Sequence, residues 1–399
     1  MRNRSLQWML IAAVCGLAAG FTDWAWLLQV ATLVSGAFVK MLQLISIPVI
    51  FLAIISTIIS METLGRFKRL GGSVFKYTVI TTLMASTIAL IMFVLIDPVP
   101  DISLRQDLLQ QTDHASYVDV VFNMIPNNLV KAFLDNNVIG IAVLAFLFGI
   151  VTLSLPAENK QTLLHLFSSL FQMFVKVAQY VIFLLPLAVF AFVMILVDGA
   201  RHDPAQLDRL LKFLLVVLSA NLIQAFVVLP LMLKYKGIQP SKVFMAVLPA
   251  LTTAFFSRSS SATLPLTIEC VSKQPISKKV VNFSLPLCTV INMNGCAAFI
   301  LAAVLFVGMS TGMEFSVWHM IAWIFLATLA AIGNASVPMG CYFLASAFLL
   351  SMGIDSPLMG QILAVYVIID MVETALNVWS DCVVTSIVGK EIGQAFDET

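Results

Sequence analysis

Charged residues are scarce in this chain of 399 residues: Asp, Glu, Lys and Arg make up 11% of the sequence, whereas hydrophobic residues make up 60%. The mean hydropathy is +0.99. Because soluble domains carry about 25% charged residues, this composition excludes an ordinary soluble protein and indicates an integral membrane protein. The formal net charge of only +1 argues against a nucleic-acid partner.

Cysteine and histidine are also few, and their spacing excludes two kinds of site. The six cysteines form no Cys-x-x-Cys pair and have no metal-ligand spacing with the four histidines. We interpret them as small packing residues, and we expect no organic cofactor. The only long hydrophilic interruption is roughly 98–127, so no soluble domain large enough for its own chemistry is predicted.

Long apolar runs, in contrast, are abundant, and a bilayer-spanning helix needs roughly 20 such residues. The short alternating segments of a membrane β-barrel are absent, and an all-α protein is predicted. The first run has the outline of a signal peptide, although a first span is favoured because polytopic chains commonly begin this way. The sequence predicts eight spans, within 8–23, 30–60, 74–96, 129–155, 163–198, 210–234, 279–310 and 356–390.

The loops between these runs differ in charge, which predicts the orientation. Basic residues gather before the first span, after the second and after the sixth, whereas the 97–119 segment holds five Asp against one Arg. By the positive-inside rule the basic loops are cytoplasmic, which places both termini in the cytoplasm, with a bacterial inner membrane as the expected location. The basic residues are Arg2, Arg4, Arg66, Lys68, Arg69, Lys76, Lys234, Lys236 and Lys242.

Polar residues inside spans are costly and therefore mark functional sites. In the last span, Asp370, Glu373, Thr374, Asn377 and Asp381 fall at roughly 0°, 300°, 40°, 340° and 20° around a helix of about 100° per residue. They share one face, opposite to an apolar face that can meet lipid or packed protein. A lone Asn or Thr usually joins helices, but three acids in register favour a polar cavity.

The seventh span carries Asn292-Met293-Asn294-Gly295 in the middle of an apolar run. Asn and Gly are poor helix formers, so a local break is predicted. Broken spans in transporters direct backbone carbonyls toward cations; hydrogen bonding of the two Asn to a neighbouring helix is the structural alternative.

Two further segments are interrupted by polar residues. The arms 242–256 and 263–270 are too short to cross a bilayer and flank Ser257-Arg258-Ser259-Ser260-Ser261. A second pair of arms lies within 318–353 and flanks the stretch from Asn334 to Gly340. Two re-entrant hairpins, each followed by a polar span, are typical of an inverted repeat with a binding site at its centre, and helix ends at the tips can receive a carboxylate.

Together these motifs resemble the dicarboxylate/amino acid:cation symporter family, with its glutamate-transporter-like fold. SRSSSATLP is similar to the first hairpin tip, INMNGC to the Asn-Met-Asp-Gly-Thr motif, ASVPMG to the second tip and DMVETALNVWSD to the last-span signature. The last of these is nearest to the bacterial sodium/serine-threonine symporter branch. The resemblance covers nearly the whole chain, with the motifs in the expected order.

The resemblance implies a homotrimer in which one part of each subunit moves like an elevator against a scaffold. The scaffold would comprise 1–73 and 98–209, and the transport domain 74–97 and 210–399, with hairpins at about 241–275 and 318–353. It also implies a substrate site made of Arg258, Ser259, Ser260, Ser261, Cys296, Val337, Pro338, Met339, Gly340, Asp370, Glu373, Thr374 and Asn377. Three cation sites would use Tyr77, Thr81, Thr82, Val290, Asn292, Met293, Asn294, Asn377 and Asp381.

Three departures from the family pattern bear on specificity. Members that take acidic substrates carry Arg where this chain has Glu373, and a carboxylate there would repel aspartate or glutamate by several kcal/mol at ~4 Å and an effective dielectric of about 20. Asn294 replaces Asp, which should weaken the third cation site. Cys296 replaces Thr and Met339 replaces a small residue; both alter the shape of the pocket.

These features predict sodium- or proton-coupled uptake of a small neutral amino acid such as serine or threonine, within a lipid bilayer. Acidic amino acids or dicarboxylates, and cationic amino acids, are the alternative substrates. An ion channel is the alternative from another class, because polar spans also line pores. No enzyme activity is expected, since Asp370 and Asp381 lie about 16 Å apart along one helix, too far to share a proton.

Overall fold

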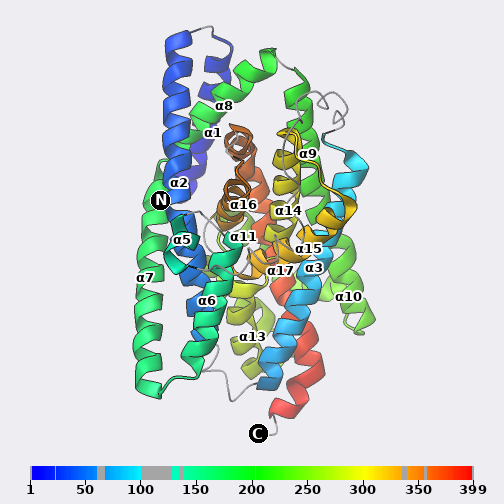
Figure 1. Cartoon of the computed structure of the whole chain (residues 1–399). Coiled ribbons are helices and arrows are strands. Elements are labelled where there is room, and N and C mark those ends of the chain that lie inside the picture. Colours follow the sequence, from blue (N-terminus) through cyan, green and yellow to red (C-terminus); the bar gives the residue numbers. More distant parts are fainter. Residues whose placement is uncertain are drawn as a thin grey trace.

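The computed structural model describes residues 2–22, 24–60, 68–99, 128–134, 138–202, 204–334, 339–354 and 357–397. Every regular element in these ranges is a helix (Figure 1). The helices are α1 (Arg2–Gly20), α2 (Ala25–Ser60), α3 (Lys68–Ile96), α5 (Leu129–Leu134), α6 (Val138–Leu153), α7 (Ala157–Phe183), α8 (Leu185–His202), α9 (Pro204–Ile223), the π-helix η3 (Gln224–Val228), α10 (Leu229–Tyr235), α11 (Pro240–Ser257), α12 (Ser260–Ser272), α13 (Lys278–Ile291), α14 (Asn294–Ser310), α15 (Val317–Ile332), α16 (Gly340–Ser351) and α17 (Pro357–Asp397).

The helices contact one another in two groups. In the first group, α2 packs against α6, α7 and α8, and α1 packs against α8. In the second, α3 packs against α9, α13, α14, α15 and α17. The groups meet where α2 contacts α16 and where α8 contacts α17. Figure 1 shows α2 and α7 along one side of the molecule, and α3 and α10 along the other.

Within the described residues, six helices are long and apolar enough to cross a membrane. They are Leu70–Ile96, Leu185–His202, Ala205–Tyr235, Pro240–Ser257, Lys278–Ser310 and Leu358–Ile392. The chain is therefore a multi-pass membrane protein of helices, as predicted. The counts of eight spans and two re-entrant hairpins remain predictions.

Two predicted spans have a different form in the structure. The run 163–198 is not one helix, because α7 ends at Phe183 and α8 starts at Leu185. Pro186 stands in the first turn of α8, and its ring has no N–H to continue the ladder of the preceding helix. Similarly, the run 210–234 contains the π-helix η3 between α9 and α10.

The predicted break in the seventh span is confirmed. Helix α13 ends at Ile291, and Asn292 and Met293 have non-helical dihedral angles (φ −99°, ψ 74° and φ −108°, ψ 67°) before α14 begins at Asn294. The break also divides the apolar core: Ile291 belongs to one buried cluster, whereas Met293 and the residues of α14 belong to another. The polar groups at the break thus lie between two apolar clusters.

The first predicted hairpin is formed by α11 and α12, which pack against each other. The chain turns at Arg258, whose φ of 52° lies in the left-handed region. The first arm, 242–256, is predicted to be too short to cross a bilayer. By length alone, this prediction is wrong. With 18 residues, α11 is about 27 Å long and reaches the lower limit for a span. At the second predicted tip, residues 335–338 lie outside the described residues.

Candidate functional site

The predicted polar stripe of α17 lies on one buried face. Asp370 is 9% exposed, and Glu373 and Asp381 are each 1% exposed. Thr374 and Asn377 are buried beside them. Opposite the stripe, Trp379 is also buried, so this part of α17 is surrounded by protein rather than lipid.

The tip of the first hairpin faces this stripe. The Arg258 guanidinium Nη1 lies 3.9 Å from Asp370 Oδ2, and both side chains are largely buried. The turn is stabilised by Ser259, whose hydroxyl accepts a hydrogen bond of 3.2 Å from the Ala262 N–H and caps α12. Arg258 therefore acts as a countercharge to Asp370, which reduces the cost of burying that carboxylate.

The three tip serines differ in their exposure. Ser260 is buried, Ser259 is half-buried and Ser261 is exposed. A shared role of the three residues in binding a carboxylate remains a prediction. The N–H groups in the first turn of α12 have no acceptor within the helix, and they carry the partial positive charge of a helix N-terminus.

Glu373 is the least satisfied charged group of the stripe. Neither of its carboxylate oxygens has a hydrogen-bond partner within ordinary distance among the described residues. The Cys341 thiol and the Tyr366 hydroxyl are close enough to interact with it. A Cβ added at Gly295 would lie 2.9 Å from Glu373 Cα, so only glycine there allows α14 to approach α17 so closely.

The residues on either side of the second predicted tip approach the same carboxylate. The Asn334 amide Nδ2 lies 3.4 Å from Cys296 Sγ and 3.8 Å from Cys341 Sγ, and all three residues are buried. Met339 is buried with a left-handed φ of 59°, directly before α16. The space beside Gly340 is filled by the Asn334 side chain. Val337 and Pro338, predicted for the substrate site, lie outside the described residues.

Asn377 links the non-helical segment to the start of α14. Its Oδ1 accepts a 2.9 Å hydrogen bond from the Gly295 N–H, and its Nδ2 donates to Met293 Sδ at 3.5 Å. Thr374, one turn earlier, donates its hydroxyl to the Asp370 carbonyl at 2.7 Å. In this state both side chains are engaged in the protein's own structure.

A buried network of amides and hydroxyls surrounds the break on its other side. Asn292 Nδ2 donates to Asp381 Oδ1 at 2.9 Å and to Ser380 Oγ at 3.0 Å. Asn294 Nδ2 donates to Asn292 Oδ1 at 2.9 Å and to Ser380 Oγ at 2.8 Å. Thr81 Oγ1 donates to Asn292 Oδ1 at 3.1 Å. Predicted cation ligands from three helices are thus in direct contact.

The remaining predicted cation ligands are placed differently. Tyr77 is not part of this network, because its hydroxyl donates to Glu391 Oε1 at 2.6 Å. Thr82 is buried, and its hydroxyl has no hydrogen-bond partner among the described residues. Val290 is only partly buried, against the apolar cluster that ends at the break.

Sequence reasoning missed four residues of the site. Gln224 Nε2 donates to Asn294 Oδ1 at 2.9 Å and to the Thr81 carbonyl at 3.0 Å. Ser380 accepts from both asparagines, and Tyr366 and Cys341 flank Glu373. Tyr366 lies four residues before Asp370 and therefore on the same helix face, which was a usable signal. For Gln224, the signal in the sequence is only that a polar residue stands in an apolar run.

The π-helix explains how Gln224 reaches the network. The wider turn of η3 lies directly before Pro230, in the first turn of α10, and π-bulges are frequent at functional sites. The Trp379 indole N–H donates to the Ala225 carbonyl at 2.9 Å. This contact fixes α17 against the π-helix and keeps Gln224 beside Asn294.

The fold and the site together define a membrane transport protein: apolar helices enclose a polar site with three acidic residues, one arginine and an interrupted helix. The chain belongs to the sodium:dicarboxylate symporter family, whose model matches residues 6–391. This family consists of transporters and not of enzymes, and it supports cation-coupled amino acid symport by this chain.

Three relatives illustrate the range of substrates. The chain is 25% identical to the proton/glutamate-aspartate symporter of Escherichia coli, over 97% of this chain and 92% of the relative. It is 24% identical to the proton/sodium-glutamate symport protein of Bacillus caldotenax, over 100% and 97%. It is also 24% identical to the human neutral amino acid transporter A, over 86% and 72%.

Proposed function

We propose that the chain is a secondary active symporter that uses the inward movement of sodium, or of protons, to take up a small neutral amino acid such as serine or threonine. The observation that carries this proposal is the buried carboxylate of Glu373, which has no hydrogen-bond partner among the described residues. A substrate hydroxyl can donate to this carboxylate, which supports a substrate with a short polar side chain.

The charges of the site support this choice of substrate. The site holds two buried carboxylates, those of Asp370 and Glu373, and one guanidinium, that of Arg258, which lies 3.9 Å from Asp370, so the substrate ammonium would be attracted and an additional carboxylate repelled. At ~4 Å and an effective dielectric of about 20, one such repulsion is about 4 kcal/mol, or roughly a thousandfold in affinity. Glutamate and aspartate would therefore be poor substrates, although two of the relatives are named for them.

The substrate carboxylate would bind between the two hairpin tips. The first-turn N–H groups of α12, at Ser260 and Ser261, and the segment from Val337 to Gly340 would receive it, as anions are bound at helix N-termini. Asp370 would accept the ammonium, and Asn377 and Thr374 would assist after releasing their present partners. Cys296 and Met339 would shape the pocket.

The cations would bind around the break in the seventh span. Asp381, with the carbonyls near Asn292, would form one sodium site, and Met293 with the backbone near Val290 would form part of a second. The third site would be weak in this chain, because the amide nitrogens of Asn294 and Gln224 cannot ligate a cation. We therefore propose fewer coupled cations than the family motif implies.

The movement would be of the elevator type, in a homotrimer with cytoplasmic termini in a bacterial inner membrane. The transport domain would comprise 74–97 and 210–399, and the scaffold 1–73 and 98–209. The two groups of contacting helices support this division, since α3 packs with α9 and later helices, whereas α2 packs with α6 to α8. The two groups also contact each other, because α2 and α6 contact α16, and α8 contacts α9 and α17.

The test is uptake into liposomes that contain the purified protein. With a sodium gradient imposed, labelled serine and threonine should accumulate above alanine, and far above aspartate, glutamate, arginine and dicarboxylates. Liposomes with equal sodium or equal pH on both sides are the controls that identify the coupling ion. Preferred uptake of aspartate or glutamate would contradict the proposed role of Glu373, and flux of many solutes without a gradient would indicate a channel.

A further inference from the structure

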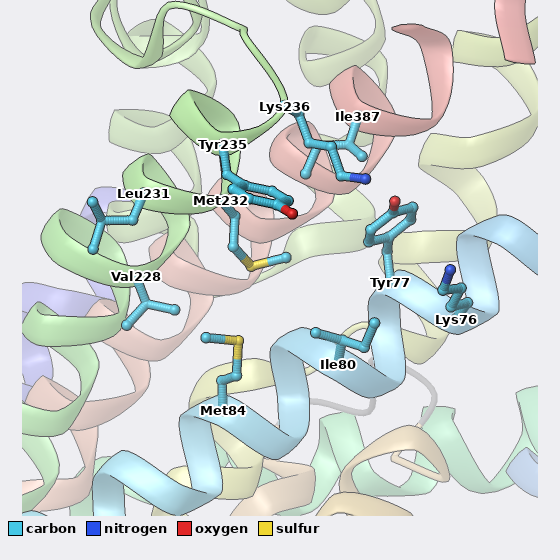
Figure 2. A pocket seen from close by; sticks show the side chains of 10 residues that line it. All are labelled: Lys76, Tyr77, Ile80, Met84, Val228, Leu231, Met232, Tyr235, Lys236 and Ile387. Carbon is cyan, nitrogen blue, oxygen red and sulfur yellow. The ribbon is translucent and has the colours of Figure 1, made fainter. Parts of the chain in front are cut away.

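A pocket of about 440 Å³ lies between α3, η3 and α10, apart from the substrate site. Figure 2 shows its side chains: Lys76, Tyr77 and Lys236 gather at one end, and Ile80, Met84 and Leu231 lie toward the other. None of the residues predicted to bind the substrate lines it. The pocket is therefore amphipathic along its length.

The polar end carries a net positive charge. Lys76 Nζ and Lys236 Nζ lie 5.7 Å and 5.3 Å from the centroid of the same Tyr77 ring. Lys390 is also near, because its Nζ donates to the Lys236 carbonyl at 2.7 Å. Among the described side chains, the carboxylate here is that of Glu391, 2.5 Å from Lys236. Three ammonium groups thus face one carboxylate among these side chains, and an anion is attracted.

The charge of Lys236 is stable at ordinary pH. Hydrogen bonding to Glu391 and to the Tyr77 hydroxyl raises the pKa of Lys236 above its usual value. Lys236 therefore stays protonated throughout the physiological range. The attraction for an anion does not depend on a change of protonation.

The polar end of the pocket lies where two spans end, at the level of the membrane surface. Lys236 directly follows the span Ala205–Tyr235, and Glu391 lies one residue before the end of the span Leu358–Ile392. The apolar end of the pocket continues along the spans, and Leu231 and Met84 are 57% and 37% exposed there. In a bilayer this surface contacts acyl chains.

We propose that this pocket binds one anionic phospholipid, with the phosphate beside Lys76 and Lys236 and an acyl chain along Ile80, Met84 and Leu231. The proposal does not rest on the symport function. A free phosphate would use only the polar end, and a neutral apolar molecule only the other end. A phospholipid with a negative headgroup complements both ends at once, and basic clusters of this kind are known to recognise anionic lipids.

The test is native mass spectrometry of the full-length protein in detergent, titrated with dioleoyl phosphatidylglycerol or dioleoyl phosphatidylcholine. The wild type should bind a first phosphatidylglycerol with a lower dissociation constant than phosphatidylcholine. Lys76→Ala should weaken the binding of phosphatidylglycerol about fivefold without affecting phosphatidylcholine. Lys234→Ala is the matched control, since Lys234 is an exposed lysine of the same region that does not line the pocket.

A second variant tests the acyl-chain end. Met84→Trp should fill the pocket and weaken the binding of phosphatidylglycerol, whereas 5 mM inorganic phosphate should not displace the lipid from the wild type. Equal binding of the two lipids, equal losses for Lys76→Ala and Lys234→Ala, or displacement by inorganic phosphate would each overturn the proposal.

Discussion

Replacing Glu373 with glutamine should separate the binding role of this residue from a structural one. The amide has nearly the shape of the carboxylate, so the close contact with Gly295 is kept and only the charge is removed. The carboxylate is 1% exposed, and neither oxygen has a hydrogen-bond partner among the described residues. Leaving a buried polar group unsatisfied costs about 1–3 kcal/mol, and more for a charged group. Glutamine would also be unsatisfied there but would carry no charge, so we expect Glu373→Gln to raise the free energy of unfolding by about 1 kcal/mol.

The same substitution should impair transport of substrates with a hydroxyl group. Glutamine Oε1 can still accept from a substrate hydroxyl, but a neutral hydrogen bond contributes about 0.5–1.5 kcal/mol where one to a charged acceptor contributes about 1.5–3 kcal/mol. The difference of about 1–1.5 kcal/mol corresponds to about a 5- to 13-fold decrease in kcat/KM for serine and threonine. Alanine has no hydroxyl to donate, so its kcat/KM should change much less. The variant should thus be more stable and less selective than the wild type.

The assay compares the uptake of labelled serine, threonine and alanine into liposomes with thermal unfolding of the same preparations. Glu269→Gln is the control, because Glu269 is an exposed carboxylate of α12 that pairs with Lys273 at 2.8 Å, and exposed ion pairs contribute little. An equal loss of serine and alanine transport would refute a contact between Glu373 and the substrate hydroxyl. A decrease in stability would show that the carboxylate is needed for folding.

Further predictions concern the packing and the amide network. Gly295→Ala should destabilise the protein by about 1–3 kcal/mol through overpacking, measured by thermal unfolding, whereas Gly72→Ala, with no atom within 4 Å of the added Cβ, should not. Asn294→Asp should lower the stability in sodium-free buffer and steepen the sodium dependence of uptake; an unchanged Hill coefficient would contradict the weak third site. Trp379→Phe removes the hydrogen-bond donor to the π-helix carbonyl and should lower the free energy of unfolding by about 1–3 kcal/mol. Similar unfolding temperatures for the variant and the wild type would contradict this.

The polar parts of the site were predictable from the sequence. The stripe of α17 follows helical periodicity, and the break at Asn292 and Met293 follows from poor helix formers inside an apolar run. The tip at Arg258 was visible as a polar interruption between two apolar arms. In each case, polar residues inside an apolar segment indicate a buried site or an interrupted helix. The pattern within that one segment was therefore enough for the prediction.

The apolar parts were less predictable, because runs without polar residues have no periodicity that marks a bend. The chain turn at Leu184 and the π-helix at Gln224–Val228 lie in long apolar runs, where one proline, Pro186, and one amide, Gln224, are weak signals. The family resemblance assigned Tyr77 to a cation site, but Glu391 and Lys236, far away in the sequence, determine where its hydroxyl points. Contacts of this kind depend on the tertiary fold and cannot be read from one segment.

The unwound segment between α13 and α14 is cross-linked by side chains rather than loose. Asn377 bonds to Met293 and Gly295, and Ser380 bonds to Asn292 and Asn294. Ordering one backbone residue costs about 1–2 kcal/mol in conformational entropy, and here that cost is met when the protein folds. At the proposed cation sites, an arriving ion would therefore exchange its water shell for protein oxygens without first immobilising a flexible loop.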